Sequence, residues 1–220
     1  ALILAGSASA TVINGTGLQD ALDGITIDGP GIDVMADQHE VDEKWQISAS
    51  GGSVATMIIE LSAYAQGNSF GVYDTNDPSK EVTLFAGSDS AGDQALLSIK
   101  ADGSVFVNFA DTGIDFVGNE FGFFLNTAVD NTWYSQTGLN ADLDLDGEGD
   151  DHMIAYQGDD ETTLQLPGYA PGIFSANEYI LAWEDLPLNT ADRDYTDFVV
   201  LVESVVGVPE PAAIAILGLG

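Results

Sequence analysis

Ala95-Leu-Leu-Ser-Ile-Lys100 is followed by Ala101-Asp-Gly103 and then by Ser104-Val-Phe-Val-Asn-Phe109, and this succession is typical of a β-hairpin. The two outer runs are rich in β-branched and aromatic residues, which favour strands, and Ala-Asp-Gly between them is a turn signal. In the last run the residues at 105, 107 and 109 alternate with Phe106 and Asn108, so a strand places the two sets on opposite faces. We therefore predict a fold built from antiparallel strands.

The same pattern recurs along the chain. Short runs of β-branched and aromatic residues, bounded by Gly, Asn and Asp, predict further strands at 45–49, 54–63, 69–73, 81–86, 120–125, 132–135, 152–157, 179–184 and 195–204. One short helix is expected at 17–24. Strands at this spacing favour an all-β fold whose antiparallel sheets pack as a β-sandwich or jelly roll. A single domain is expected at 11–204, because no Pro/Ser-rich linker divides it.

The chain is strongly acidic. Its 220 residues include 36 Asp and Glu against 4 Lys and Arg, for a net charge of −32. Self-repulsion of that size destabilises a compact state unless counter-ions condense on the protein or bind it at specific sites. A chain without a basic patch is not expected to bind nucleic acid. Hydrophobic residues make up 45% of the sequence, enough for a core, so the chain is not a disordered acidic tail.

A calcium-type loop is predicted at Asp142-Leu-Asp144-Leu-Asp146-Gly147-Glu148-Gly-Asp150. Its carboxylates alternate along the chain, and Gly147 permits the sharp turn that lets them converge on one ion. Ca²⁺ takes roughly 6–8 oxygen ligands, which carboxylates, backbone carbonyls and water supply. The loop is not an EF-hand, because Met153 stands where an EF-hand has a bidentate Glu, and a ligand from elsewhere is expected to complete the site. The alternative is a solvated acidic turn.

A second acidic group is predicted closer to the C-terminus. Glu184 and Asp185 end one predicted strand, while Asp192, Asp194 and Asp197 begin the next. If these two strands pair, five carboxylates crowd one end of the sheet, which is costly unless a cation lies among them. Two interpretations stay open: a second calcium site, or a carboxylate cluster bridged by the arginine at 193.

Asp74, Asn76 and Asp77 form a third polar group, directly before Pro78. Asn and Asp side chains hydrogen-bond to the backbone in turns, and Pro is common beside them. A hairpin turn is therefore expected here rather than a metal site.

The two ends of the sequence are typical of export signals. Residues 1–10 combine an apolar run with Ala8-Ser9-Ala10, the small-x-small form of a signal-peptide cleavage site. Val208-Pro-Glu-Pro-Ala-Ala-Ile-Ala-Ile-Leu-Gly-Leu-Gly220 resembles the PEP-CTERM sorting signal of Gram-negative bacteria. That resemblance implies export, transient membrane anchoring and delivery to the cell surface or extracellular matrix. The segments 1–10 and 205–220 are therefore set apart from the domain.

Several blocks in the middle of the chain carry a second resemblance. They are Ser69-Phe-Gly-Val-Tyr-Asp74, Asn76-Asp-Pro78, Phe121-Gly-Phe-Phe124, Asp151-His-Met-Ile-Ala-Tyr-Gln157, Ile180-Leu-Ala-Trp-Glu-Asp-Leu-Pro187 and Asp192-Arg-Asp-Tyr-Thr-Asp-Phe198. Together they resemble a bacterial surface domain of unknown function that often precedes PEP-CTERM tails. The family is usually Gly-rich between the last two blocks, whereas this chain has Leu188-Asn-Thr-Ala191 there. The resemblance implies a β-fold and a surface location, but no particular activity.

The sequence gives little sign of catalysis. It has no G-x-S-x-G elbow, P-loop or H-E-x-x-H motif, and its 2 histidines are His39 and His152. His152 begins an apolar run beside the calcium-type loop, so a hydrogen-bonded structural imidazole is expected there. The 3 Trp and Tyr134 are expected in the core or on a sheet face, with stacking on sugar rings as the alternative. We predict that the protein is not an enzyme.

Two functions are compatible with these features. The first is an extracellular, calcium-stabilised structural protein that assembles with copies of itself, as a filament or matrix subunit, by strand addition between neighbours. The chain has no cysteine, so calcium is the expected substitute for disulfide cross-links. The alternative is a cell-surface module that binds the polysaccharide of the extracellular matrix. A secreted hydrolase is a third hypothesis, and it needs a cleft with converging carboxylates.

Overall fold

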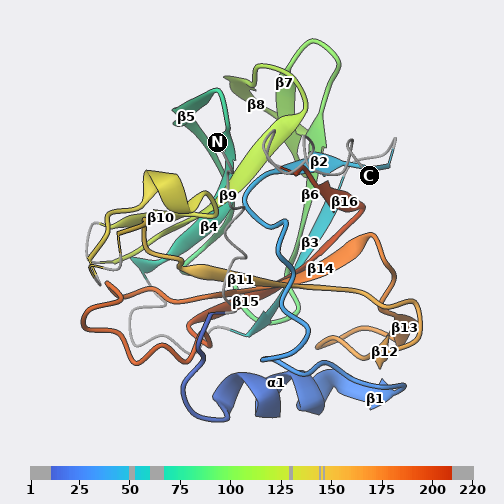
Figure 1. Ribbon diagram of the computed structural model, residues 1–220. Coiled ribbons are helices and arrows are strands. Elements are labelled where there is room, and N and C mark those ends of the chain that lie inside the picture. Colours follow the sequence, from blue (N-terminus) through green and yellow to red (C-terminus); the bar gives the residue numbers. More distant parts are fainter. Residues whose placement is uncertain are drawn as a thin grey trace, which may run out of the picture.

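The computed structural model describes residues 11–49, 53–59, 67–128, 131–143, 145 and 147–209 (Figure 1). Most of them lie in or between antiparallel strands, so the predicted all-β fold is confirmed. Residues 1–10 and 210–220, which include most of both predicted sorting signals, lie outside the described residues, as do Asp144 and Asp146. Within the described ranges, no helix combines the length and the apolar character that a membrane span requires.

The described strands form three antiparallel sheets. The largest has seven strands, in the order β11 (Met153–Gln157), β14 (Glu178–Trp183), β15 (Phe198–Glu203), β3 (Ser53–Ile59), β6 (Gln94–Ile99), β7 (Ser104–Val107) and β8 (Ala110–Asp115). The second has six: β16 (Val205–Gly207), β2 (Trp45–Ile47), β9 (Glu120–Asn126), β4 (Ser69–Asp74) and β5 (Asp77–Ala86) in this order, with β10 (Thr132–Tyr134) also paired to β9. The smallest joins β1 (Thr26–Asp28), β12 (Thr163–Leu164) and β13 (Gly172–Ile173).

The two large sheets pack face to face, and β14 lies in the middle of the molecule with both of its faces buried. Side chains at alternate positions of β14, Tyr179, Leu181 and Trp183, join the core between the large sheets. Ile180 and Ala182 point the other way and join a second core. An apolar run without polar alternation is what a strand buried on both faces requires.

The second core is closed by α1 (Gly17–Ile25) and the smallest sheet, which cover the outer face of the seven-stranded sheet at β11, β14 and β15 (Figure 1). Leu18, Leu22 and Ile25 of α1 are all buried. Their spacing of four and three residues places them on one face of the helix. The sandwich therefore has a third layer, which covers the three strands β11, β14 and β15.

The hairpin at 95–109 is confirmed, but its second strand ends earlier than predicted. β7 stops at Val107, which pairs with Ala110 of β8, and Asn108 and Phe109 form the turn with φ angles of 50° and 66°. Phe109 is 86% exposed, so it does not share a buried face with Val107. Two-residue hairpin turns of this hand usually have Asn-Gly, so the Asn-Phe pair gave no turn signal.

Five strands lie outside the predicted set: β1, β8, β12, β13 and β16. Four of them have only two or three residues, too few for alternation to show. β16 adds to the edge of the six-stranded sheet by pairing with β2, so the sheet extends beyond residue 204, where the domain was expected to end. Short strands of this kind are defined by their partners rather than by their own sequence.

Candidate metal centre

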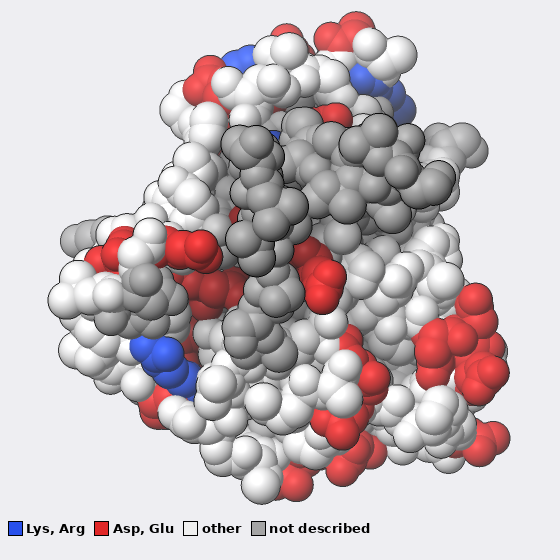
Figure 2. All heavy atoms as spheres, in the orientation of Figure 1, with Lys and Arg blue, Asp and Glu red and all other residues white. Residues whose placement is uncertain are grey.

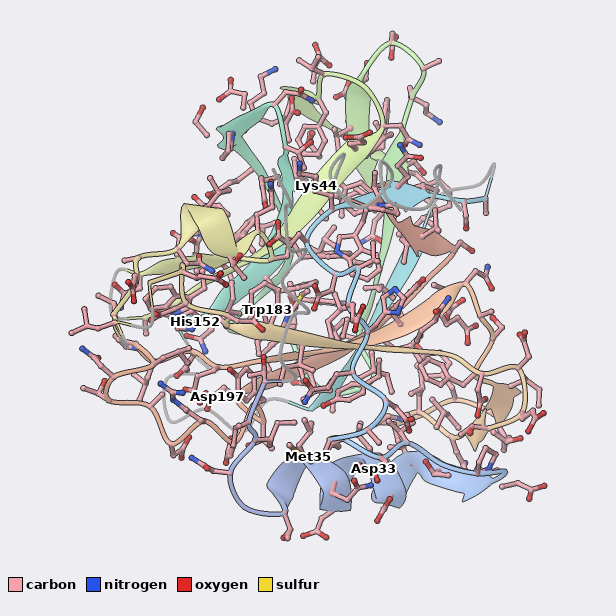
Figure 3. The ribbon with its side chains drawn as sticks, viewed as in Figure 1. Asp33, Met35, Lys44, His152, Trp183 and Asp197 are labelled. Atoms are coloured by element: carbon pink, nitrogen blue, oxygen red, sulfur yellow. The ribbon has the colours of Figure 1, made fainter. Side chains whose placement is uncertain are left out.

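Three neighbouring strands place the second acidic group at one end of the seven-stranded sheet. The pairings of β11 with β14 and of β14 with β15 both reach Trp183. The next residues outward are His152, Glu184 and Asp197, and Figure 3 shows His152, Trp183 and Asp197 on the same side of the sandwich. The predicted pairing of the two acidic strands is therefore confirmed.

Five carboxylates gather here and form two overlapping groups of three that share Glu184. The inner triad is Glu184, Asp185 and Asp197, and the outer triad is Glu184, Asp192 and Asp194. Within each triad, one carboxylate oxygen per residue lies within 4.8 Å of the others. Oxygens at that separation fit around one ion with Ca–O distances of about 2.3–2.6 Å. The predicted second acidic group is thus one cluster that could hold a metal ion.

Glu184 is the residue of this cluster whose burial is hardest to explain without a ligand. Its side chain is 0% exposed. Its Oε1 accepts a hydrogen bond from the backbone N–H of Leu186 (3.2 Å), whereas its buried Oε2 has no hydrogen-bond partner among the described residues. Leaving a carboxylate oxygen buried and unpaired is costly, so this oxygen needs a proton or a cation.

The neighbouring carboxylates make the ionised form of Glu184 still less favourable. Burial, and then the carboxyl group of Asp197, raise the pKa of Glu184 to about 9. Burial also raises the pKa of Asp197 to about 6, and the hydrogen bond from the Asp185 backbone N–H is the main effect that opposes this rise. In the absence of a cation, Glu184 therefore carries a proton at neutral pH.

Local hydrogen bonds hold three of the other four carboxylates in place. Asn68 donates from Nδ2 to Oδ2 of Asp185 (3.0 Å), and the backbone N–H of Asp185 donates to Oδ2 of Asp197 (3.0 Å). Asp194 accepts at Oδ1 from both the backbone N–H (2.9 Å) and the Oγ1 (2.7 Å) of Thr196. The orientation of these three side chains is thus fixed before any ion binds.

The outer triad lies on the loop between β14 and β15, not on a strand. Arg193 and Tyr195 have φ angles of 57° and 54°, which are incompatible with a strand, so β15 begins at Phe198 rather than at the predicted position 195. Asp192 is exposed. Arg193 donates from Nε to the carbonyl of Leu188 (3.2 Å) across this loop.

The calcium-type loop is described in part. Gly147 has a φ of 102°, which confirms the sharp turn that the sequence requires, and its N–H donates to Oδ2 of Asp142 (3.2 Å). The other oxygen of Asp142 is buried and has no partner in the described ranges. Asp150 is buried and accepts at Oδ1 from the backbone N–H of Leu143 (2.9 Å), while Glu148 is exposed. Neither triad includes a residue of this loop.

His152 lies between the loop and the two triads. Its Nδ1 is 3.0 Å from the carbonyl of Glu184, which can only accept, so Nδ1 carries the proton. Its Nε2 is 3.8 Å from Oδ2 of Asp150. The ring stacks on Trp133 at 3.7 Å, and Trp133 donates from Nε1 to the carbonyl of Asp185 (2.9 Å). These contacts agree with the expectation of a structural imidazole. They also show that the calcium-type loop and the two triads are neighbours.

A further acidic pair lies beside this site and was not predicted from the sequence. Burial, and then the charge of Asp151, raise the pKa of Asp42 well above its ordinary value. Burial raises the pKa of Asp151 to about 6, opposed mainly by a hydrogen bond from Thr11 Oγ1 (2.8 Å). Asp42 and Asp151 come from distant parts of the chain, so no local pattern could have paired them.

The third predicted group is a turn, as expected. Asp74 is 0% exposed, and its Oδ1 accepts from the backbone N–H of Asn76 (2.9 Å). Its Oδ2 accepts from the backbone N–H of Val117 (2.7 Å) and lies 3.9 Å from Nζ of Lys80. Both oxygens therefore have partners from the protein itself.

Comparison of the chain with protein-family models, with curated proteins and with solved structures gave no match. The chemistry of the site therefore rests on its own residues. Two triads of carboxylate oxygen donors, one largely buried and one partly exposed, are suited to holding a cation.

Proposed function

We propose that this protein is an extracellular, calcium-stabilised structural protein that assembles with copies of itself as a filament or matrix subunit. One observation carries the calcium part of this proposal. Glu184 is fully buried beside four other carboxylates, and its Oε2 has no hydrogen-bond partner in the described part of the chain. A cation satisfies this oxygen and also neutralises the repulsion among the carboxylates.

The donor set favours calcium over other metals. All members of both triads offer carboxylate oxygen, and the chain has no cysteine. Oxygen-only sites suit Ca²⁺ and Mg²⁺, and Ca²⁺ accepts irregular geometry, whereas Mg²⁺ demands a near-octahedral shell. The surface adds to the attraction, because Figure 2 shows many Asp and Glu side chains and few Lys or Arg.

Calcium in this cluster would act as a cross-link. Glu184 follows β14, Asp197 precedes β15, and Asn68, which holds Asp185, lies directly before β4 of the opposing sheet. An ion bound here therefore ties two strands of one sheet and a loop to the other sheet. With the Kd of roughly 10⁻⁴–10⁻³ M that is typical of extracellular modules, millimolar calcium would stabilise the fold by about 0.4–1.4 kcal/mol per site.

The location and the assembly are supported by the sequence. The resemblance of the two ends to export and PEP-CTERM signals supports a cell-surface or matrix location in a Gram-negative bacterium. A net charge of −32 opposes the packing of identical subunits, so assembly would need calcium to screen or bridge them. Calcium would then control both the folding and the association of the protein.

The alternative, a carbohydrate-binding module, gains no support from the three tryptophans. Trp45, Trp133 and Trp183 are all buried in the structure, with exposures of 0%, 4% and 0%. Stacking on a sugar ring requires an accessible ring face, which none of these residues offers. A structural role for these three tryptophans is what their burial supports.

The calcium proposal is tested by thermal unfolding at constant ionic strength. We expect 2 mM Ca²⁺ to raise the Tm by several degrees over the chelator-treated protein, and 2 mM Mg²⁺ to raise it much less. A protein of this size gains about 2–4 °C for each kcal/mol. A Tm that is the same in calcium and in chelator would exclude a stabilising calcium site.

The assembly proposal has its own test. We expect light scattering and electron microscopy of the full chain to detect oligomers or filaments in millimolar calcium, and their dissociation when a chelator is added. A chain that stays monomeric in calcium, while its Tm still rises, would leave the calcium site in place but contradict self-assembly. The two parts of the proposal can therefore fail separately.

A further inference from the structure

Glu184 belongs to both triads. In the described part of the chain, the five carboxylates do not form one set whose oxygens all lie within 4.8 Å of one another. They form two sets of three that each meet this separation, and Glu184 belongs to both. A single ion, with ligands about 2.3–2.6 Å away, reaches only oxygens that lie within about 5 Å of one another. We propose that this cluster binds two calcium ions, one in each triad, with the Glu184 carboxylate bridging them. This inference rests on the proposed calcium site and adds its stoichiometry and its shared ligand.

The two oxygens of Glu184 suit a bridging role. Oε1 has one weak hydrogen bond, from the backbone N–H of Leu186 at 3.2 Å, and Oε2 has none from the described residues. Both can therefore face ions without losing strong protein partners. Ions in two-metal protein sites lie about 3.5–4 Å apart, a separation that one carboxylate spans.

The charge of the cluster also favours two ions. Its five carboxylates carry −5 when ionised, and Arg193 is the one cationic residue in the segment from 184 to 197. One Ca²⁺ would leave a net charge of −2 in a partly buried site, whereas two would leave it neutral. Uncompensated charge away from water is strongly unfavourable, so the neutral state is preferred.

The two positions differ in their exposure to solvent. Glu184 and Asp185 of the inner triad are buried, at 0% and 2% exposure, and Asp197 is half-buried. In the outer triad Asp192 is exposed and Asp194 is half-buried. We therefore expect the inner ion to bind more tightly and exchange more slowly than the outer ion, which water reaches more easily.

Counting bound calcium by equilibrium dialysis tests the inference. Relative to the wild-type chain, we expect Asp192→Asn to lose one ion, Asp197→Asn to lose one, and Glu184→Gln to lose two. Glu161→Gln, an exposed acidic residue outside the cluster, should lose none. Any calcium held by the loop at 142–150 cancels in these differences.

The outcomes separate the two-ion inference from the calcium site itself. A loss of one ion in Glu184→Gln, or an unchanged count in Asp192→Asn, would overturn the two-ion site and leave a single calcium site. A loss of no ion in Glu184→Gln would overturn both. Because Asp192 is exposed, its substitution is not expected to impair folding, so the count in Asp192→Asn is decisive even if Glu184→Gln does not fold.

Luminescent lanthanides supply a second measurement. In protein loaded with equal amounts of Tb³⁺ and Eu³⁺, ions about 4 Å apart transfer energy from terbium to europium with high efficiency. We expect this transfer in the wild-type chain and a marked fall in Asp192→Asn. Equal transfer in the two proteins would contradict the placement of the second ion in the outer triad, and no transfer in the wild-type chain would contradict two adjacent ions.

Discussion

Trp133 and Trp183 are both buried beside the acidic cluster, but their indole nitrogens differ. Trp133 donates from Nε1 to the carbonyl of Asp185, whereas Nε1 of Trp183 is buried without a partner among the described residues. Trp133→Phe removes a hydrogen bond to a buried carbonyl, which costs about 0.5–1.5 kcal/mol beyond the lost packing. Trp183→Phe removes a donor that was already unsatisfied. We expect Trp133→Phe to destabilise the protein more, although Trp183 is the more deeply buried residue.

Urea unfolding of the two variants measures this difference, and calorimetric titration with calcium extends it. Because Trp133 holds the backbone of Asp185, its substitution should also weaken calcium binding several-fold, whereas Trp183→Phe should weaken it less. Equal losses of stability in the two variants would mean that the indole hydrogen bond contributes nothing.

At the level of single residues, the acidic residues of the site could be predicted from the sequence, but the residues that position them could not. Glu184, Asp185 and the aspartates before β15 were predicted because strand pairing brings them together. Trp133 and Asn68 were not predicted, because they lie 52 and 117 positions from Asp185 in the chain. Contacts of that range depend on how the two sheets pack, which no local pattern specifies.

Among the strands, the contact of β4 with β9 depends on a glycine. Gly122 of β9 pairs with Tyr73 of β4, and a Cβ added to Gly122 would lie 2.3 Å from the tyrosine ring. The ring cannot move aside easily, because Tyr73 is 0% exposed and its hydroxyl donates to Oε1 of Gln136 (3.0 Å). Overpacking of this kind typically costs about 1–3 kcal/mol, so we expect Gly122→Ala to lower the Tm by several degrees.

Gly138 provides the matched control for this substitution. It lies in the short 3₁₀ helix η2 (Thr137–Leu139), and a Cβ there would meet nothing within 4 Å. Gly138→Ala should change the free energy of unfolding by no more than about 0.5 kcal/mol. If calorimetric melting gives the same Tm for both variants, the close approach of Tyr73 to Gly122 is not a constraint on the sheet.

The elements that could be predicted are those with strong patterns of their own. β9 and β14 have long apolar runs, and α1 has a repeating apolar face, so their positions follow from the sequence. The turn at Asn108 and Phe109 did not, because its left-handed backbone is imposed by the pairing of β7 with β8 rather than favoured by Phe. The third layer was missed for a similar reason, since β12 and β13 exist only as partners of β1 and of each other.

For the molecule as a whole, the buried carboxylates make stability depend on pH in an unusual direction. In the folded state the pKa of Glu184 is raised to about 9, and those of Asp151 and Asp197 to about 6. The unfolded chain releases these protons near the ordinary values of 4.5 for Glu and 3.8 for Asp. Between these limits the folded state binds more protons than the unfolded state. The calcium-free protein therefore loses stability as the pH rises.

We expect the Tm of the chelator-treated protein to fall between pH 5 and pH 9. Up to about pH 6, the fall in Tm includes the loss of protons from Asp151 and Asp197. From pH 7 to pH 9, it comes mainly from the loss of the proton from Glu184. Calcium binds the ionised carboxylates, so its affinity and its stabilising effect should increase over the same range. The difference in Tm between calcium and chelator should thus be larger at pH 8 than at pH 5. Melting curves at several pH values and constant ionic strength measure both trends.

The variant Glu184→Gln separates the contribution of the acidic cluster to the pH dependence of stability from the contribution of the overall charge. An amide resembles the protonated carboxyl group but does not ionise, so the calcium-free variant should lose little stability between pH 7 and pH 9 beyond what general repulsion causes. Calcium should also stabilise it much less than the wild-type protein at pH 8. If the chelator-treated wild-type protein instead gains stability as the pH rises, the carboxylates are paired with donors in the folded state and the cluster has no need of a cation. A fall in both proteins of equal size would assign the pH dependence to the −32 charge rather than to Glu184.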